Sequence, residues 1–286
     1  MNIVKARKYF YFLSLFIIII GLLSFGVKGL NYGIDFTGGT LIEMKFKQAV
    51  NIADVRSVLE DVGISRDSRV QEGEGNVIIM RTKELSQAKS GELLKSMEEK
   101  IGSYTLLRNQ SVGPTIGKEL RYNALLSVII AFVLMVVYIT IRFEFLSGLA
   151  AVAALIHDVL VTVGLVSLLG LEVDGAFIAA LLTIVGYSIN NTIIVFDRVR
   201  ENMGKKKKGE SLDEIIHRSI MQTLTRSINT SLTVVFVLAA LILFGGYTIR
   251  SFILILLIGV VAGCYSSVLL ASPLFYDFRR LRGASL

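Results

Sequence analysis

Six stretches of apolar residues, each long enough to cross a membrane, constrain this chain more than any other feature. A helix needs about 20 apolar residues to span roughly 30 Å of hydrocarbon. The stretches lie at about 9–27, 122–141, 145–171, 176–197, 228–246 and 251–274. The mean hydropathy of +0.65 and the hydrophobic content of 53% agree with this interpretation. The sequence therefore predicts an α-helical membrane protein with six transmembrane helices.

The basic residues are distributed unevenly, and their distribution predicts the topology. Of the net charge of +7, the segment 28–121 carries only +1, from 14 Lys and Arg against 13 Asp and Glu. The surplus lies in clusters at Lys5, Arg7 and Lys8, at Arg142, at Arg198 and Arg200, at Lys205–Lys208, and at Arg279, Arg280 and Arg282. With six spans, all these clusters fall on one side of the membrane. Because positively charged loops stay in the cytoplasm, we expect both termini to be cytoplasmic.

This topology divides the chain into four segments. They are 1–27 (cytoplasmic N-terminus and first span), 28–121 (extracytoplasmic domain), 122–274 (spans two to six, with a cytoplasmic loop at 198–227) and 275–286 (cytoplasmic basic tail). The first span follows basic residues, as a signal peptide does, but its length and the lack of an Ala-x-Ala site favour an uncleaved anchor. The run Lys205–Lys208 could bind nucleic acid or acidic lipid, and we favour a solvated topology determinant with no nucleic-acid partner.

The segment 28–121 has the pattern of a small α+β domain. Hydrophobic and charged residues alternate over 42–47, which predicts a half-buried strand. Further elements are expected as a helix over 52–62, a hairpin over 69–81, a helix over 93–101 and a strand over 104–108. The order βαββαβ is the ferredoxin-like arrangement, which hosts many functions and decides none.

Several classes of site are disfavoured by the sequence. Cys264 is the only cysteine, and His157 and His217 are the only histidines, so we expect no disulfide within the chain and no metal site. The glycine-rich segments 33–40 and 113–119 resemble a phosphate-binding loop but lack its full set of residues. We therefore expect no cofactor, no catalytic residue and no enzymatic activity.

Polar residues inside the apolar stretches are the strongest functional signal. The third span contains His157 and Asp158, the fourth contains the adjacent Asn190 and Asn191 and ends near Asp197, and the fifth begins at Arg226. Each unpaired polar group costs several kcal/mol in hydrocarbon, so these residues must face other helices or water. They are candidates for a proton or ion relay between spans three, four and five. The alternative is a set of hydrogen bonds that holds helices together, which we favour for Thr162, Ser188, Thr192 and Thr233.

Two further patterns concern helix packing. Ser211 and Glu214 form a capping box before an apolar stripe over 212–224, which predicts a helix along the membrane surface that leads into span five. In that span, polar residues follow Arg226 at helical spacing, and this pattern favours an inward role for the arginine. Gly259 and Gly263 form a small-xxx-small motif in the sixth span.

Four segments of the sequence resemble a known family. They are Gly33-Ile-Asp-Phe-Thr-Gly-Gly-Thr40, Val112-Gly-Pro-Thr-Ile-Gly-Lys-Glu-Leu120, Ile156-His-Asp-Val159, and 185–201 with its Gly-Tyr-Ser-Ile-Asn-Asn core. In this order across six spans, they are similar to the SecF branch of the SecD/SecF family of protein-export membrane proteins. The resemblance covers nearly the whole chain.

The resemblance implies a function that the residues alone do not. SecF proteins pair with a SecD subunit in a unit similar to resistance-nodulation-division transporters, in the bacterial cytoplasmic (inner) membrane. The pair assists the SecYEG translocon and uses the proton motive force to move exported, unfolded polypeptide. The resemblance thus implies a SecD-like subunit, SecYEG, exported polypeptide and membrane lipids as partners.

The resemblance extends to two residues of the membrane-spanning stretches. Arg226 matches an arginine that the family uses in proton passage, whereas Asn191 stands where the family has an aspartate. Asparagine cannot bind or release a proton, so the aspartate of SecD takes this role, Asp158 shares it, or the chain is uncoupled. Two other functions stay open: half of a small-molecule or lipid exporter, and a passive scaffold at the translocon.

Overall fold

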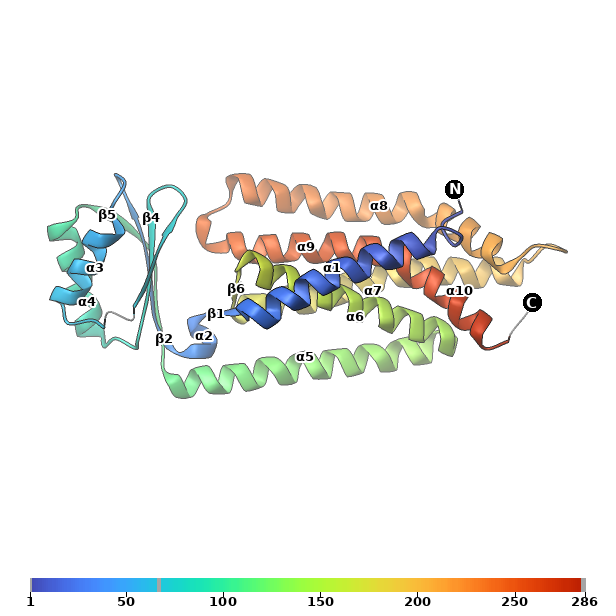
Figure 1. Ribbon diagram of the computed structural model, residues 1–286, viewed down its shortest axis with the longest axis horizontal. Helices are drawn as coiled ribbons and strands as arrows, with labels where there is room; N and C mark the ends of the chain where they lie inside the picture. Colours follow the sequence, from blue (N-terminus) through green and yellow to red (C-terminus); the bar gives the residue numbers. More distant parts are fainter. Residues whose placement is uncertain (1, 66–67, 284–286) are drawn as a thin grey trace. The chain divides into compact units, whose positions relative to one another are not determined.

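The computed structural model describes residues 2–65 and 68–283, and the chain forms two compact units (Figure 1). One unit consists of Met1–Asn31 with Ser127–Leu286, and the other of Tyr32–Leu126. The first is helical, and the second contains most of the strands. Each is described separately below.

The helical unit confirms the six predicted membrane-spanning helices. They are α1 (Arg7–Lys28), α5 (Pro114–Arg142, which begins in the other unit), α6 (Phe145–Leu169), α7 (Gly175–Gly204), α8 (Leu212–Phe244), and a last span over Tyr247–Leu281. The last span consists of the 3-10 turn η1 (Tyr247–Ile249), α9 (Arg250–Ser266), the π turn η2 (Ser267–Ala271) and α10 (Ser272–Leu281). By length and composition, these are the six candidate spans within the described residues.

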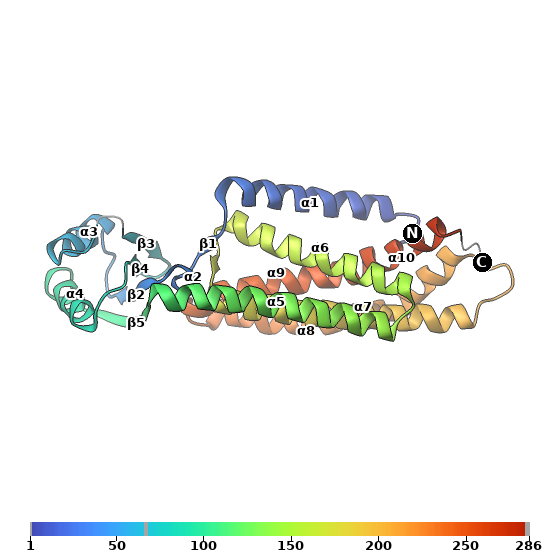
Figure 2. The same ribbon diagram turned by 90° about the horizontal axis from the view of Figure 1, so that it is seen from below.

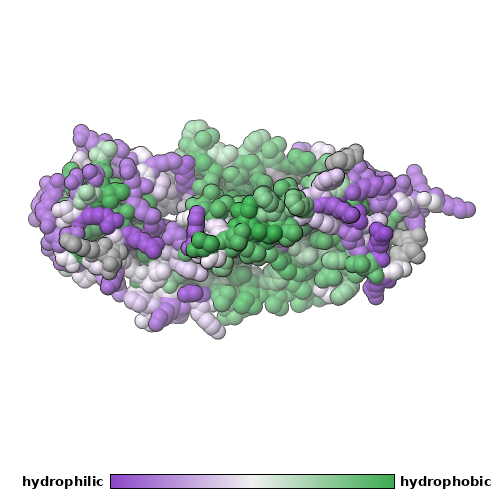
Figure 3. Space-filling view, viewed as in Figure 1, coloured by the Kyte–Doolittle hydropathy of each residue, from purple (hydrophilic) through white to green (hydrophobic). Residues whose placement is uncertain are grey.

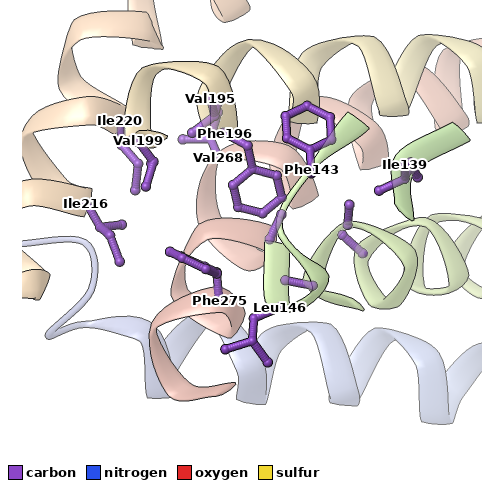
Figure 4. Packing of buried hydrophobic residues seen from close by; sticks show 14 of the residues in the cluster. Ile139, Phe143, Leu146, Val195, Phe196, Val199, Ile216, Ile220, Val268 and Phe275 are labelled. Carbon is purple, nitrogen blue, oxygen red and sulfur yellow. The ribbon is translucent and has the colours of Figure 1, made fainter. Parts of the chain in front are cut away.

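The predicted surface helix before span five is wrong as a separate element. It is continuous with the span, because α8 begins at its capping box and no glycine or proline interrupts it before Phe244. Its apolar stripe does not face lipid: Ile215, Ile216 and Ile220 are fully buried. Ile216 and Ile220 pack in the cluster of Figure 4.

Aromatic rings form the centre of that cluster (Figure 4). The rings of Phe143 and Phe196 have centroids 6.2 Å apart, and those of Phe196 and Phe275 are 5.8 Å apart. These contacts join the end of α5 to α7 and α10. Outside the cluster, the helical unit carries a broad hydrophobic belt (Figure 3), as expected for a surface in contact with lipid.

The helix α1 lies along α6 at the edge of the bundle (Figure 2). Glycines allow a close crossing there, because a Cβ atom on Gly21 would lie 2.7 Å from the Cα of Gly164. The short strands β1 (Asn31–Tyr32) and β6 (Glu172–Val173) pair after these helices.

The second unit has the predicted ferredoxin-like topology. Its elements are α2 (Ile34–Thr37), β2 (Gly39–Phe46), α3 (Ile52–Asp61), β3 (Arg69–Gly73), β4 (Val77–Thr82), α4 (Gln87–Lys100) and β5 (Tyr104–Val112). The four main strands are antiparallel in the order β3-β4-β2-β5. Val55 of α3 and Leu93 and Met97 of α4 are fully buried against the sheet.

The strand β2 differs from its predicted half-buried pattern. It is one of the two inner strands of the sheet, and of its eight residues only Lys45 is exposed. Even Glu43 is 4% exposed. Neighbours on both edges, β4 and β5, cover positions that alternation alone assigns to solvent.

The glycine-rich segment that resembles a phosphate loop has a backbone role here. Gly38 and Gly39 have φ values of 73° and 126°, which side chains rarely allow. A Cβ on Gly38 would lie 3.0 Å from the Cα of Pro114, and one on Gly39 would overlap the carbonyl oxygen of Thr82. The glycines therefore let β2 start against the beginning of α5.

Candidate functional site

A buried carboxylate joins three membrane-spanning helices. Asp158 of α6 is 0% exposed. Its Oδ2 accepts hydrogen bonds from Ser188 Oγ of α7 at 2.5 Å and from Ser266 Oγ of α9 at 2.7 Å. Its Oδ1 lies 3.0 Å from His157 Nδ1. A buried charge is tolerated only when it is paired or hydrogen-bonded, and this carboxyl group has three partners.

Small residues bring these helices close enough for the two serines to share one oxygen. A Cβ on Gly263 would lie 3.0 Å from the Cβ of Ser188, and one on Gly259 would overlap Ile184. The predicted small-xxx-small packing is thus confirmed between α9 and α7. One turn beyond Gly263 towards the C-terminus, Ser266 reaches the carboxylate that Ser188 also contacts.

His157 extends the polar site towards α1. Its ring stacks on Tyr265 at a centroid distance of 6.0 Å. The Tyr265 hydroxyl donates to the carbonyl of Phe10 at 2.8 Å and lies 3.2 Å from Ser14 Oγ. His157 is 6% exposed, and its Nε2 has no hydrogen-bond partner among the residues that the structure describes. His157 and Tyr265 also line an otherwise apolar groove of about 390 Å³ between α1, α6 and α9.

Asn191 lies on α7 one turn from Ser188 but does not join the carboxylate. It is 0% exposed, and neither atom of its amide has a partner within the described part of the chain. The hydroxyl oxygens of Tyr187 on α7 and of Ser227 and Ser231 on α8 are also buried without a hydrogen-bond partner in that part of the chain. The structure thus contains unsatisfied buried polar atoms on both of these packed helices.

The remaining candidates do not lie in the buried site. Asn190 and Arg226 are exposed, and neither side chain has a hydrogen bond or ion pair within residues 2–65 and 68–283. Asp197 accepts from Arg142 and Arg200, each at 3.2 Å. Asp158 contacts α7 and α9 rather than α8, and the relay between spans three, four and five stays a prediction.

Arg226 does not face the interior of this chain, and its inward role stays a prediction. The helix α8 buries Ser227, Ser231 and Leu238 instead. Of the polar residues that follow the arginine at helical spacing, Asn229 and Thr233 are exposed and Thr230 is half-buried. Helical spacing identifies residues that share a face, but it does not say whether that face meets the same chain or a partner.

Sequence reasoning missed Ser266 as a partner of Asp158. A signal was present, because the sixth apolar stretch contains three closely spaced serines, Ser266, Ser267 and Ser272, and all three are fully buried. Among the described residues, no three His, Cys, Asp or Glu side chains come together as metal ligands would. The chemistry available at the site is that of one carboxyl group, one imidazole and two hydroxyl groups.

Comparisons with known proteins cover both units. The family described as "Protein export membrane protein SecD/SecF, C-terminal" matches residues 92–281, and "SecD/SecF GG Motif" matches residues 23–50. The protein translocase subunit SecF of Sebaldella termitidis is 41% identical, over 99% of this chain and 93% of that protein. SecF of Acidaminococcus fermentans is 41% identical, over 98% of this chain and 97% of that protein.

A solved structure has the same fold. The crystal structure of SecDF, a translocon-associated membrane protein from Thermus thermophilus, matches with a TM-score of 0.89 and 35% identity. The match covers 98% of this chain but 39% of the SecDF chain. A structure of SecDF in a super-membrane-facing form matches with a TM-score of 0.73. This chain thus spans about two fifths of the SecDF chain.

Proposed function

This chain belongs to the SecD/SecF family of protein-export membrane proteins, and from that premise we propose that it works as a SecF-type subunit of a complex that assists Sec-dependent translocation. It is a multi-pass membrane protein. In the proposed complex, a SecD-like subunit pairs with it beside the SecYEG translocon. The complex draws on the proton motive force to move unfolded polypeptide across the bacterial cytoplasmic membrane.

The observation that carries the proposal is the full-length match to part of a larger assembly. Nearly all of this chain superposes on SecDF, yet it accounts for 39% of that chain. A SecD-like partner would supply the remainder. The exposed polar side chains of Asn190 and Arg226 support this proposal, because in lipid they are costly unless another subunit or water covers them.

The proposed function includes coupling of translocation to the proton motive force. One charge that crosses the membrane gains about 2.3 kcal/mol per 100 mV, which is enough to bias two helix arrangements. Arg226 matches the family arginine, but Asn191 replaces the family aspartate and cannot carry a proton. This substitution is the specific observation that favours a second candidate, a passive scaffold that holds partners near the translocon.

Protein translocation into inverted membrane vesicles separates these candidates. Vesicles with the chain and its SecD-like partner should translocate a secretory protein faster than vesicles without them, and a protonophore should remove this stimulation. Arg226→Met should also remove it while the two subunits still co-purify, whereas Lys206→Met, at an exposed loop position, serves as the control. Stimulation that survives the protonophore would leave the scaffold as the function.

A deletion strain tests the exporter alternative. Loss of the gene should slow secretion without raising sensitivity to toxic small molecules. The opposite pattern, with normal secretion and raised sensitivity, would assign the chain to a small-molecule exporter.

A further inference from the structure

We propose that the His157–Asp158 pair is this chain's own membrane-embedded proton-binding site, and that its protonation acts on the π turn of the last span through Ser266. The inference deepens the proposed function, on whose proton coupling it rests. It assigns proton binding to the carboxyl group of Asp158 rather than to the position of Asn191.

The protonation state of the resting pair follows from its hydrogen bonds. A doubly protonated His157 would leave a charged N–H group at Nε2 without an acceptor, since this atom is buried and has no partner among the described residues. The ring is therefore neutral, with its Nδ1–H donating to Asp158 Oδ1. The carboxylate then accepts three hydrogen bonds, the number expected for an ionised group that cannot donate.

The pair carries one negative charge that no cation neutralises. The groups that face it are Ser188 on α7, Ser266 on α9, and Tyr265, whose ring stacks on His157. Within the described ranges, no Lys or Arg forms an ion pair with Asp158, and Tyr265 links the pair to α1 through Phe10 and Ser14. An isolated negative charge in a membrane-spanning segment is costly, so binding of one proton is the simplest way to remove it.

The proton can enter at the one ring nitrogen that is free. A proton that enters through the groove bonds to His157 Nε2, the Nδ1–H bond breaks, and an O–H bond forms at Asp158 Oδ1. The pair gains one proton, and its charge changes from −1 to 0. The imidazole thus passes a proton from one nitrogen to the other, the property that makes histidine a proton shuttle. His157 lines the groove between α1, α6 and α9, so the approach is from that side rather than from α8.

Protonation weakens the link to the last span. A hydrogen bond to an ionised acceptor is roughly twice as strong as a neutral one, so the neutral carboxyl group holds Ser266 less firmly. Ser266 is the last residue of α9 and directly precedes the π turn η2. Such turns are rare and often lie at functional sites. Beyond it, Asp277 of α10 accepts from Arg7 of α1 at 2.9 Å, so a shift of η2 is passed to α1.

Infrared difference spectroscopy of the full chain in lipid bilayers tests the site directly. Lowering the pH from about 8 to about 5 should produce a carboxylic-acid C=O band in the unchanged chain. Asp158→Asn should abolish this band, and Asp158→Glu should retain a band at a shifted frequency. Asp54→Asn, which removes an exposed carboxyl group from α3, is the matched control and should leave the band intact.

Hydrogen exchange tests the coupling. The protection factors of the η2 amides, which correct for the slower intrinsic exchange at lower pH, should fall at the lower pH in the unchanged chain, and this response should be lost in Asp158→Asn and in Ser266→Ala. Circular dichroism and gel filtration check that each variant is folded, and Asp158→Glu keeps the test valid if Asp158→Asn does not fold. A C=O band that persists in Asp158→Asn would overturn the site, and an η2 response that persists would overturn the coupling.

These measurements need neither a SecD-like partner nor an exported polypeptide. Export that ignores the proton gradient would defeat the proposed function and leave the band unaffected. Export that depends on the gradient, together with a missing band, would defeat this inference alone.

Discussion

Asn191 and Asn202 are two buried amides on one helix that differ in their surroundings. Asn202 Nδ2 donates to Ser219 Oγ and to Gln222 Oε1, each at 2.8 Å. Asn191 has no such partner within the described residues, although it is fully buried. A buried amide without partners has lost its hydrogen bonds to water and has gained no hydrogen bonds that replace them. Asn202 thus stabilises the packing of α7 on α8, and Asn191 does not.

Asn191 and Asn202 allow a matched measurement of what these hydrogen bonds contribute to stability. Asn202→Ala should cost about 1–2 kcal/mol more free energy of unfolding than Asn191→Ala, because both changes remove the same side-chain atoms but only one removes hydrogen bonds. Unfolding of the isolated chain in detergent, followed by circular dichroism, measures the difference. Equal losses would mean that water or another group satisfies the Asn191 amide.

The same scale shows what sequence could predict about the site. The burial of Asp158 beside His157 follows from their position in an apolar stretch, where a charge must face inward. Its serine partners on α7 and α9 depend on how those helices are rotated against α6, which no local pattern specifies. The exposure of Arg226 could not be predicted either, since a polar stripe has the same sequence pattern whether it meets this chain or another subunit.

At the scale of elements, the crossing of α1 and α6 depends on two glycines without side chains between them. The Cβ position of Gly164 would lie 2.7 Å from the backbone of Gly21. A backbone atom cannot move aside as the end of a side chain can. Close approach at such crossings gives the van der Waals contact that holds membrane helices together.

Gly164→Ala should therefore loosen this helix pair. We expect a loss of about 1–3 kcal/mol in the free energy of unfolding, the usual cost of overpacking. Gly186→Ala is the control, because a Cβ at Gly186 meets no atom within 4 Å, and that change should be neutral or slightly stabilising. Thermal unfolding in detergent compares them, and an unchanged Gly164→Ala chain would show that α1 does not need this contact.

The strand β5 provides a pH-dependent test in the α/β unit. Burial, and then the charge of Glu98, raise the pKa of Tyr104, whose hydroxyl donates to the carbonyl of Leu94 at 3.0 Å. Because the folded pKa is above the unfolded one, the stabilisation is complete below the unfolded pKa of about 10 and is lost as the pH rises through the folded value.

Tyr104→Phe should therefore reduce the alkaline loss of stability. At about pH 8 it should cost about 0.5–1.5 kcal/mol for the lost hydrogen bond. At higher pH, the gap to the unchanged chain should narrow. Urea unfolding of the full chain, followed by proteolysis within 32–126, measures both, and Tyr32→Phe is the control in the same unit. A difference in unfolding free energy between the two chains that stays constant from about pH 8 upwards would contradict the role of Tyr104.

The sequence predicted the types and order of the elements better than it predicted where one element ends and the next begins. Apolar length identified six spans, and periodicity with turn residues identified the βαββαβ order. It did not predict that α8 is one helix, because a change from amphipathic to fully apolar residues suggests a boundary that the backbone does not need. The π turn η2 was also missed, since it adds one residue to a turn without changing composition.

At the scale of the helical unit, contacts bring the basic segments to one end. Lys5 Nζ lies 3.7 Å from Asp213 at the start of α8, and Arg279 of α10 lies 3.8 Å from Glu144 before α6. Figure 3 shows hydrophilic residues gathered at the end of this unit that carries both termini, beyond the hydrophobic belt. The contacts are independent of the charge pattern, and they gather the same segments that this pattern assigns to the cytoplasm.

Cysteine labelling tests which side that end faces. In a Cys264→Ser background, no other thiol remains, so Lys206→Cys and Glu74→Cys each provide a single site. Lys206 lies in the basic loop before α8, and Glu74 lies in the turn between β3 and β4. A membrane-impermeant maleimide should label Glu74→Cys in cells with a permeable outer layer, and Lys206→Cys only after lysis. Lys5→Cys should behave as Lys206→Cys does, because Lys5 and the start of α8 are in contact. Labelling of Lys206→Cys before lysis would invert the topology, and the α/β unit could then not act on polypeptide that leaves the translocon.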